Sequence, residues 1–158
     1  MTMLRRLLTA PDESPQIASL RRIALFSGLS RAELRTVNGR MHHRSYLKDE
    51  IIFDEGEEGQ AVYFVLAGRV LICRQGRPQD GAIATLEAGQ CFGELALLDE
   101  APRMAQVRAA EDCQLAVLFR EDFLSLLLTH AEIGSRLSLA LAQMLGHRLR
   151  ETVNRFVV

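Results

Sequence analysis

Residues 92–107 contain the glycine, carboxylate and arginine residues whose spacing is most suggestive of chemistry. Gly93 follows a short apolar run and permits a sharp turn, and Leu95–Leu98 favour a single helical turn. Pro102 ends that turn before an extended segment begins at Arg103. A single helical turn between two strands leaves its first amides unpaired, at the positive end of the helix dipole. The stretch therefore predicts a site for an anion.

Arg103 and Glu94 extend this prediction from an anion to a nucleotide. Arg103 would return beside the turn and offer a bidentate partner to a phosphate. A carboxylate beside a phosphate is unfavourable unless it accepts a hydrogen bond from the ligand, and a ribose hydroxyl could donate one to Glu94. Phosphate and ribose in one small pocket indicate a nucleotide. A plain salt bridge between Glu94 and Arg103 on the rim of a barrel is the alternative.

Three apolar patterns define the elements that must position these residues. From residue 15 to residue 40 the spacing is helical, with a break at Gly28 and a capping box at Ser30 and Glu33. Residues 43–119 contain eight short apolar runs between glycine turns, as in a jelly roll or barrel. Residues 120–157 are helical again, with a long helix from about 131 to 156. We expect a mainly β fold with flanking helices, after an N-terminal tail over residues 1–14.

The long C-terminal helix carries a wide apolar stripe, wider than a surface helix on one small barrel requires. We interpret the stripe as packing both on the barrel and on a second copy of the chain, which predicts a homodimer. The alternative is that the whole stripe packs into the core of a single chain. Its residues are Ile133, Leu137, Ala140, Leu141, Met144, Leu145 and Leu149.

Composition narrows the classes of function. The 158 residues suit one compact domain, and 19 basic against 20 acidic residues give a net charge of -1. This balance predicts no direct nucleic-acid binding, although the Arg-rich N-terminal end could touch an acidic partner. Three widely spaced cysteines indicate neither a disulfide framework nor a zinc site, and they fit buried thiols in the cytoplasm. No run approaches the ~20 apolar residues of a membrane span, so we expect a soluble protein.

Catalytic and metal-binding patterns are weak. His42 and His43 are adjacent, and neighbouring residues on a strand point to opposite faces, so they would not share a metal. The sequence shows no Ser-His-Asp set and no paired carboxylates on a common frame. We therefore expect neither an enzyme nor a metal site.

The residues of the predicted anion site also resemble a known family. Gly93-Glu94-Leu95-Ala96, Pro102-Arg103 and Ala105-x-Val107 resemble the phosphate-binding cassette of the cyclic nucleotide-binding domain superfamily. Five further blocks stand in the order found in bacterial catabolite-activator-type regulators, so the resemblance covers nearly the whole chain. The blocks are Leu25-Phe26-x-Gly28-Leu29-Ser30, Ile52-Phe53-x-Glu55-Gly56-Glu57-x-Gly59, Tyr63-Phe64-Val65-Leu66-x-Gly68-x-Val70, Ile83-Ala84-Thr85-Leu86 and Arg148-Leu149-Arg150.

The resemblance implies a double-stranded β-helix (jelly-roll) sensor over residues 15–158 and a cyclic AMP or cyclic GMP ligand. By motif position, Glu94 would accept from the ribose 2′-hydroxyl, and Arg103 would hold the cyclic phosphate with backbone amides near Ala96 and at Met104. The residues expected at the ligand are Gly93, Glu94, Leu95, Ala96, Arg103, Met104, Ile83 and Ala84.

Two departures from the family pattern matter. Met104 stands where relatives usually have a small or hydroxylated residue, which removes a side-chain hydrogen bond to phosphate and adds bulk. After Arg150 only eight residues remain, too few for a helix-turn-helix domain. We expect a stand-alone sensor that signals to an effector protein through its C-terminal helix. A ligand-free docking scaffold and the sensor half of a truncated DNA-binding regulator are the alternatives.

Overall fold

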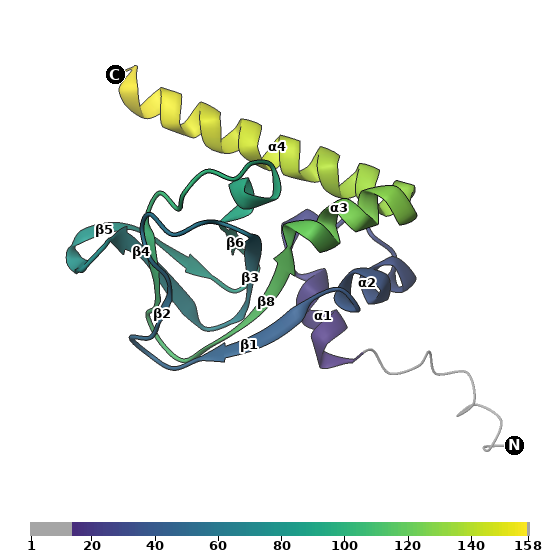
Figure 1. Ribbon diagram of the computed structural model, residues 1–158, viewed down its shortest axis with the longest axis horizontal. Helices are drawn as coiled ribbons and strands as arrows, with labels where there is room; N and C mark the ends of the chain where they lie inside the picture. The colour runs from purple at the N-terminus through teal and green to yellow at the C-terminus, as the bar shows by residue number, and fades with distance from the viewer. Residues whose placement is uncertain (1–13, 158) are drawn as a thin grey trace, which may run out of the picture.

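Two four-stranded antiparallel sheets form the centre of the molecule, as the computed structural model shows for residues 14–157 (Figure 1). Their strand orders are β1-β8-β3-β6 and β2-β7-β4-β5. These sheets make the expected jelly roll. The strands are β1 (His42–Tyr46), β2 (Ile51–Phe53), β3 (Ala61–Ala67), β4 (Arg69–Arg74), β5 (Arg77–Glu87), β6 (Cys91–Phe92), β7 (Gln106–Ala109) and β8 (Cys113–Phe119).

Two apolar cores hold the roll together. The inner core lies between the sheets and includes Val65, Leu115 and an aromatic group in which the Tyr63 and Phe92 rings stack with centroids 5.1 Å apart. The outer core is larger and joins β3 and β8 to the helices through residues such as Phe64. Side chains alternate between the faces of a strand, so β3 and β8 are buried on both sides. This explains their nearly continuous apolar sequences.

The N-terminal helices pack on the outer core and begin as the sequence predicts. They are α1 (Pro15–Arg21), the 3-10 helix η2 (Ala24–Phe26) and α2 (Arg31–Asn38). The capping box that opens α2 is confirmed, since Ser30 accepts from the Glu33 amide at 3.2 Å and Glu33 accepts from the Ser30 amide at 3.0 Å. Arg136 donates to the same Glu33 carboxylate at 2.7 Å, which ties α2 to the long C-terminal helix.

Two C-terminal helices, α3 (Arg120–Thr129) and α4 (Ala131–Phe156), follow the last strand. Figure 1 shows α4 crossing the top of the molecule, with its C-terminal end beyond the helices and above the roll. The two helices approach closely at Gly134, where an added Cβ would lie 2.7 Å from Leu127 Cδ2. Any larger residue at position 134 would therefore push α3 and α4 apart.

The apolar stripe predicted on α4 is divided differently from our expectation. Leu137 and Leu141 are buried in the outer core, and Met144 and Leu145 pack against its edge and stay partly exposed. Of the predicted stripe, Leu149 is strongly exposed. Leu137 and Leu141 therefore belong to the core of a single chain, while Met144 and Leu145 are only partly buried by it, and the homodimer stays a prediction.

Other sequence expectations can be checked directly. All three cysteines are free and buried, as predicted.

The two adjacent histidines have separate partners. His42 packs edge-on against the Phe119 ring, while His43 contacts Asn38 at 2.8 Å. Within residues 14–157, no three His, Cys, Asp or Glu side chains are grouped so that they could hold a metal ion. None of the helices described is long and apolar enough to cross a membrane.

Candidate functional site

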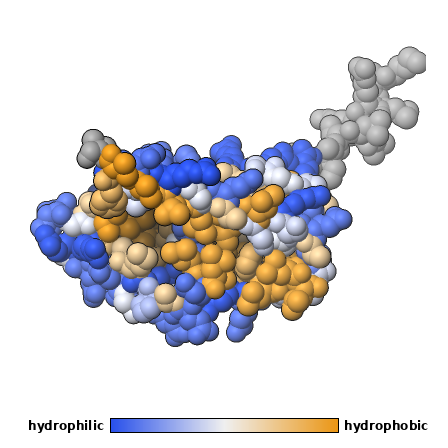
Figure 2. Space-filling view, turned by 90° about the horizontal axis from the view of Figure 1, so that it is seen from above, coloured by the Kyte–Doolittle hydropathy of each residue, from blue (hydrophilic) through white to orange (hydrophobic). Residues whose placement is uncertain are grey.

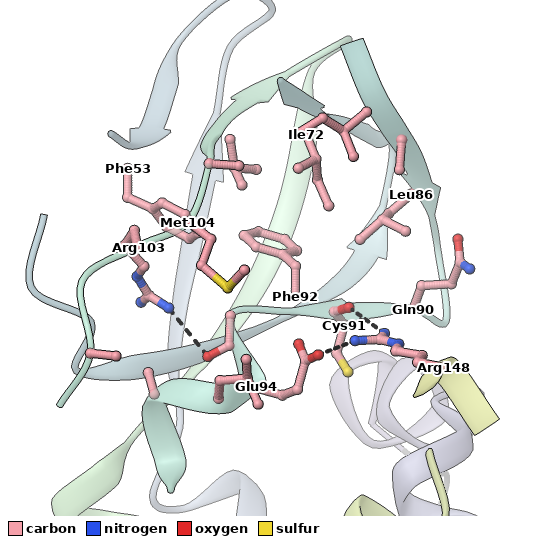
Figure 3. Close-up of a pocket in the computed structure, with 18 of the residues that line it drawn as sticks. Phe53, Ile72, Leu86, Gln90, Cys91, Phe92, Glu94, Arg103, Met104 and Arg148 are labelled. Atoms are coloured by element: carbon pink, nitrogen blue, oxygen red, sulfur yellow. Dashed lines mark hydrogen bonds and ion pairs between the residues drawn. The ribbon is translucent and has the colours of Figure 1, made fainter. Parts of the chain in front are cut away.

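A cavity of about 780 Å³ lies between one end of the roll and the C-terminal half of α4. Figure 2 shows hydrophobic side chains around a hollow near the C-terminal end of α4. Figure 3 shows the inside, where Phe53, Ile72, Leu86 and Phe92 form the apolar wall and Glu94, Arg103 and Arg148 supply charge. The cavity thus combines an apolar surface with a few charged groups, as small-molecule sites commonly do.

The predicted helical turn forms one edge of this cavity as the 3-10 helix η3 (Glu94–Leu97). It is a 3-10 turn because Ala96 N–H donates to the Gly93 carbonyl three residues earlier, at 3.1 Å. Gly93 itself has φ of 74°, a conformation that favours glycine. Since the Ala96 amide is already used inside the turn, the amides before it are the ones available to a ligand.

Arg103 lies beside η3, as predicted, and is already hydrogen-bonded. One terminal nitrogen donates to the Gly93 carbonyl at 3.2 Å and the other to the Ala61 carbonyl at 2.8 Å. The guanidinium carbon lies 4.1 Å from the centroid of the Phe53 ring, a cation–π contact. An arginine has five N–H donors, so three remain for a ligand. Burial lowers the pKa of Arg103, but an arginine keeps its positive charge at neutral pH.

Glu94 is paired with an arginine that sequence reasoning did not assign to the site. Its Oε1 accepts from Arg148 of α4, and Arg148 also donates to the Cys91 carbonyl at 3.2 Å (Figure 3). The salt bridge between Glu94 and Arg103 considered above is therefore not the one that forms. Glu94 keeps its second carboxylate oxygen for a ligand, because a carboxylate can accept several hydrogen bonds.

The remaining predicted residues lie at the mouth or along the wall of the cavity. Ile83 and Ala84 of β5 and Leu95 and Ala96 of η3 all line it. Met104 also lines the cavity, and its 76% exposure shows that the side chain is largely uncovered. The structure thus brings all eight predicted residues to one cavity.

The C-terminal half of α4 adds residues that were not predicted at the site. These residues recur every three or four positions, which places them on one face of the helix. The spacing was visible in the sequence, but nothing there indicated which face of α4 meets the roll. The added residues are Arg148, Glu151, Thr152 and Arg155.

Comparisons with known proteins agree with this geometry. The family described as "Cyclic nucleotide-binding domain" matches residues 43–130. The cyclic AMP receptor protein of Thermus thermophilus is 40% identical over 128 residues, which are 80% of this chain and 57% of that protein. This chain therefore spans less than two thirds of that relative.

Solved structures show the same fold. The N-terminal domain of a transcriptional regulator from Streptomyces coelicolor matches with a TM-score of 0.72 and 28% identity, over 89% of this chain and 96% of that one. The regulatory domain of Toxoplasma gondii PKA, solved with cAMP, matches with a TM-score of 0.69 and 28% identity, over 85% of this chain and 50% of that one.

Proposed function

This chain belongs to the cyclic nucleotide-binding domain family, and we propose that it binds cyclic AMP or cyclic GMP and signals through α4 to an effector protein. The observation that carries the proposal is the meeting of Glu94 and Arg103 in a cavity that α4 also lines. A ligand there would touch both the roll and α4, so binding could change how α4 sits on the roll. The chain would then act by binding a ligand rather than by catalysis.

Each part of a cyclic nucleotide has a matching group in the cavity. The cyclic phosphate would take the free N–H donors of Arg103 and the first amides of η3. The ribose 2′-hydroxyl would donate to the Glu94 carboxylate. The base would then lie between Ile83 on the apolar wall and Thr152 on the polar face of α4.

We also propose that two copies associate through a second apolar row on α4. This row alternates steps of three and four residues, the spacing of a coiled-coil seam. Large side chains in it are exposed, with Leu149 at 63% and Phe156 at 83%, so a second copy of the same row would bury them. The row comprises Leu139, Ala142, Gly146, Leu149, Val153 and Phe156.

Calorimetric titration with cyclic AMP and cyclic GMP tests ligand binding. We expect micromolar or tighter binding of at least one of them. Arg103→Ala should lose about 2–4 kcal/mol of binding free energy, because charge-assisted contacts to phosphate disappear. Glu94→Gln should lose less, because an amide oxygen can still accept from a hydroxyl. Arg69→Ala is the matched control, since Arg69 forms an exposed ion pair with Glu111.

Three results would contradict these roles. An absence of heat and of thermal stabilisation with either nucleotide at millimolar concentration would remove the sensor and favour the ligand-free docking scaffold. Equal losses for Arg103→Ala and Glu94→Gln would contradict the separate phosphate and ribose assignments. A loss for Arg69→Ala would show that the variants act through general destabilisation.

A further inference from the structure

Arg120, the first residue of α3, holds the anion-binding turn without lining the cavity among the residues described. Its Nε donates to the Ala96 carbonyl at 2.9 Å, and a terminal nitrogen donates to the Gly59 carbonyl at 2.7 Å. Its side chain is only 17% exposed. We propose that Arg120 is a positioning residue that sets η3 in the geometry needed to bind a cyclic phosphate. The inference rests on the proposed binding of cyclic nucleotides.

Arg120 and Arg103 bridge the same two backbone segments. Arg103 joins the Gly93 carbonyl to the Ala61 carbonyl, at the first end of η3. Arg120 joins the Ala96 carbonyl to the Gly59 carbonyl, at the other end. The turn is thus attached at both ends to residues 59–61, just where β3 begins.

The backbone around Arg120 strengthens this attachment. Its amide donates to the Gln60 carbonyl at 2.8 Å, so carbonyls 59, 60 and 61 all accept from Arg120 or Arg103. An added Cβ at Gly59 would lie 3.1 Å from the Ala96 Cβ, which shows how closely the two segments approach. Glu100 lies 3.4 Å from the Arg120 guanidinium, but it is 81% exposed and adds little.

A four-residue 3-10 turn needs such support. Turns of this kind have poor hydrogen-bond geometry, and η3 has no side-chain cap at its N-terminus. Without Arg120, the Ala96 and Gly59 carbonyls lose charged donors and the turn can leave its binding position. Ligand affinity falls in proportion to the fraction of molecules in which the turn is in place.

Substitutions at Arg120 separate positioning from direct contact. At Arg103 the two roles coincide, because that side chain both holds the turn and faces the ligand. Arg120→Met removes the donors and keeps a long unbranched side chain, while Arg120→Lys keeps a charged donor at a similar reach. Arg136→Met is the matched control, because Arg136 pairs with Glu33 on α2 and does not line the cavity.

Two measurements on the whole chain test the proposal. Calorimetry with cyclic AMP and cyclic GMP should show affinity falling about tenfold in Arg120→Met, as for roughly one lost hydrogen bond to a charged group. Arg120→Lys should recover part of the loss, and Arg136→Met should stay within about twofold of wild type. Amide NMR shifts of residues 93–97 without ligand should move in Arg120→Met and stay in place in Arg136→Met.

The outcomes distinguish this inference from the proposed function. Three results would each overturn the positioning role. They are an Arg120→Met affinity equal to that of wild type, unmoved amide shifts at residues 93–97 in Arg120→Met, and a loss of affinity in Arg136→Met as large as in Arg120→Met. If Arg120→Met fails to fold, the test passes to Arg120→Lys. An Arg120→Lys protein with the same ligand affinity and the same amide shifts as wild type would overturn the positioning role as well. A wild-type chain that binds neither nucleotide would refute the proposed function, while the NMR shifts would still decide whether Arg120 holds the turn.

Discussion

Replacing Arg148 by methionine should loosen the C-terminal half of α4 from the roll. Arg148 connects that half to β6 and η3 through the Glu94 ion pair and the hydrogen bond to the Cys91 carbonyl. Methionine keeps much of the unbranched stem, so the substitution removes charge and donors without opening a large cavity. The variant therefore isolates the polar contribution to helix docking.

The size of the effect follows from the burial of the two partners. The Arg148 side chain is 39% exposed and the Glu94 side chain 10%, so the pair lies between an exposed and a buried one. Exposed ion pairs contribute about 0–1 kcal/mol to stability, and breaking a buried pair costs about 3–5 kcal/mol. We therefore expect the free energy of unfolding of Arg148→Met to be about 2 kcal/mol lower than that of wild type. For a chain of this length that corresponds to a fall in Tm of about 4–8 °C.

Urea and thermal unfolding of wild type, the two single variants and the double variant would measure the contribution of the Arg148–Glu94 pair. Arg148→Met and Glu94→Gln should each destabilise, and the double variant should be more stable than their sum predicts, because no charge is then left buried without its partner. Arg150→Met is the control, since Arg150 is exposed and should change stability by less than about 0.5 kcal/mol. An Arg148→Met protein as stable as the control, or strictly additive single effects, would refute the reasoning.

Three further predictions concern the cavity mouth, the apolar row of α4 and a buried thiol. Met104→Ser should tighten cyclic nucleotide binding by about 1 kcal/mol in calorimetry, because a hydroxyl can bond the phosphate and the exposed methionine loses little packing; weaker binding would show that the thioether contacts the ligand. Leu149→Glu should give folded monomers in sedimentation analysis, whereas Leu141→Glu should unfold the chain because Leu141 is in the core. A wild-type chain that is monomeric at high micromolar concentration would contradict the dimer. Burial, aided by the nearby Glu94 charge, raises the pKa of Cys91 from 9.0 to about 11, so its contribution to stability is complete below pH 9 and lost as pH rises through 11. Urea unfolding should show a steeper decline in wild type than in Cys91→Ala, where Tyr63, Cys73 and Cys113 still titrate with raised pKa values. Identical pH profiles for the two proteins would contradict the role of Cys91.

Local patterns predicted most of the fold. The capping box at Ser30 and Glu33 depends on residues three apart, and it forms as expected. The long helix is found at Ala131–Phe156 because helical apolar spacing continues through that range without a strong turn signal. The residues around η3 could be found from their order along the chain, because one short segment supplies both Glu94 and Arg103.

Contacts between distant segments were not predictable in the same way. Arg148 lies 54 residues from Glu94, and Arg120 lies 61 residues from Gly59, so only the folded chain reveals either contact. The apolar residues of α4 illustrate the same limit. Leu141 and Leu149 both fit helical spacing, but the crossing of α4 over the core decides that the first is buried and the second exposed.

The two carbonyl contacts of Arg103 also have a consequence for the speed of recognition. A free arginine side chain must give up rotational freedom when it binds a ligand, at a cost of about 1 kcal/mol for an immobilised side chain. In this protein Gly93, Ala61 and the Phe53 ring already restrain the guanidinium, so that entropy is lost when the chain folds. The phosphate would meet a preorganised cation, and its association rate should be set by diffusion and access past α4 rather than by rearrangement of Arg103.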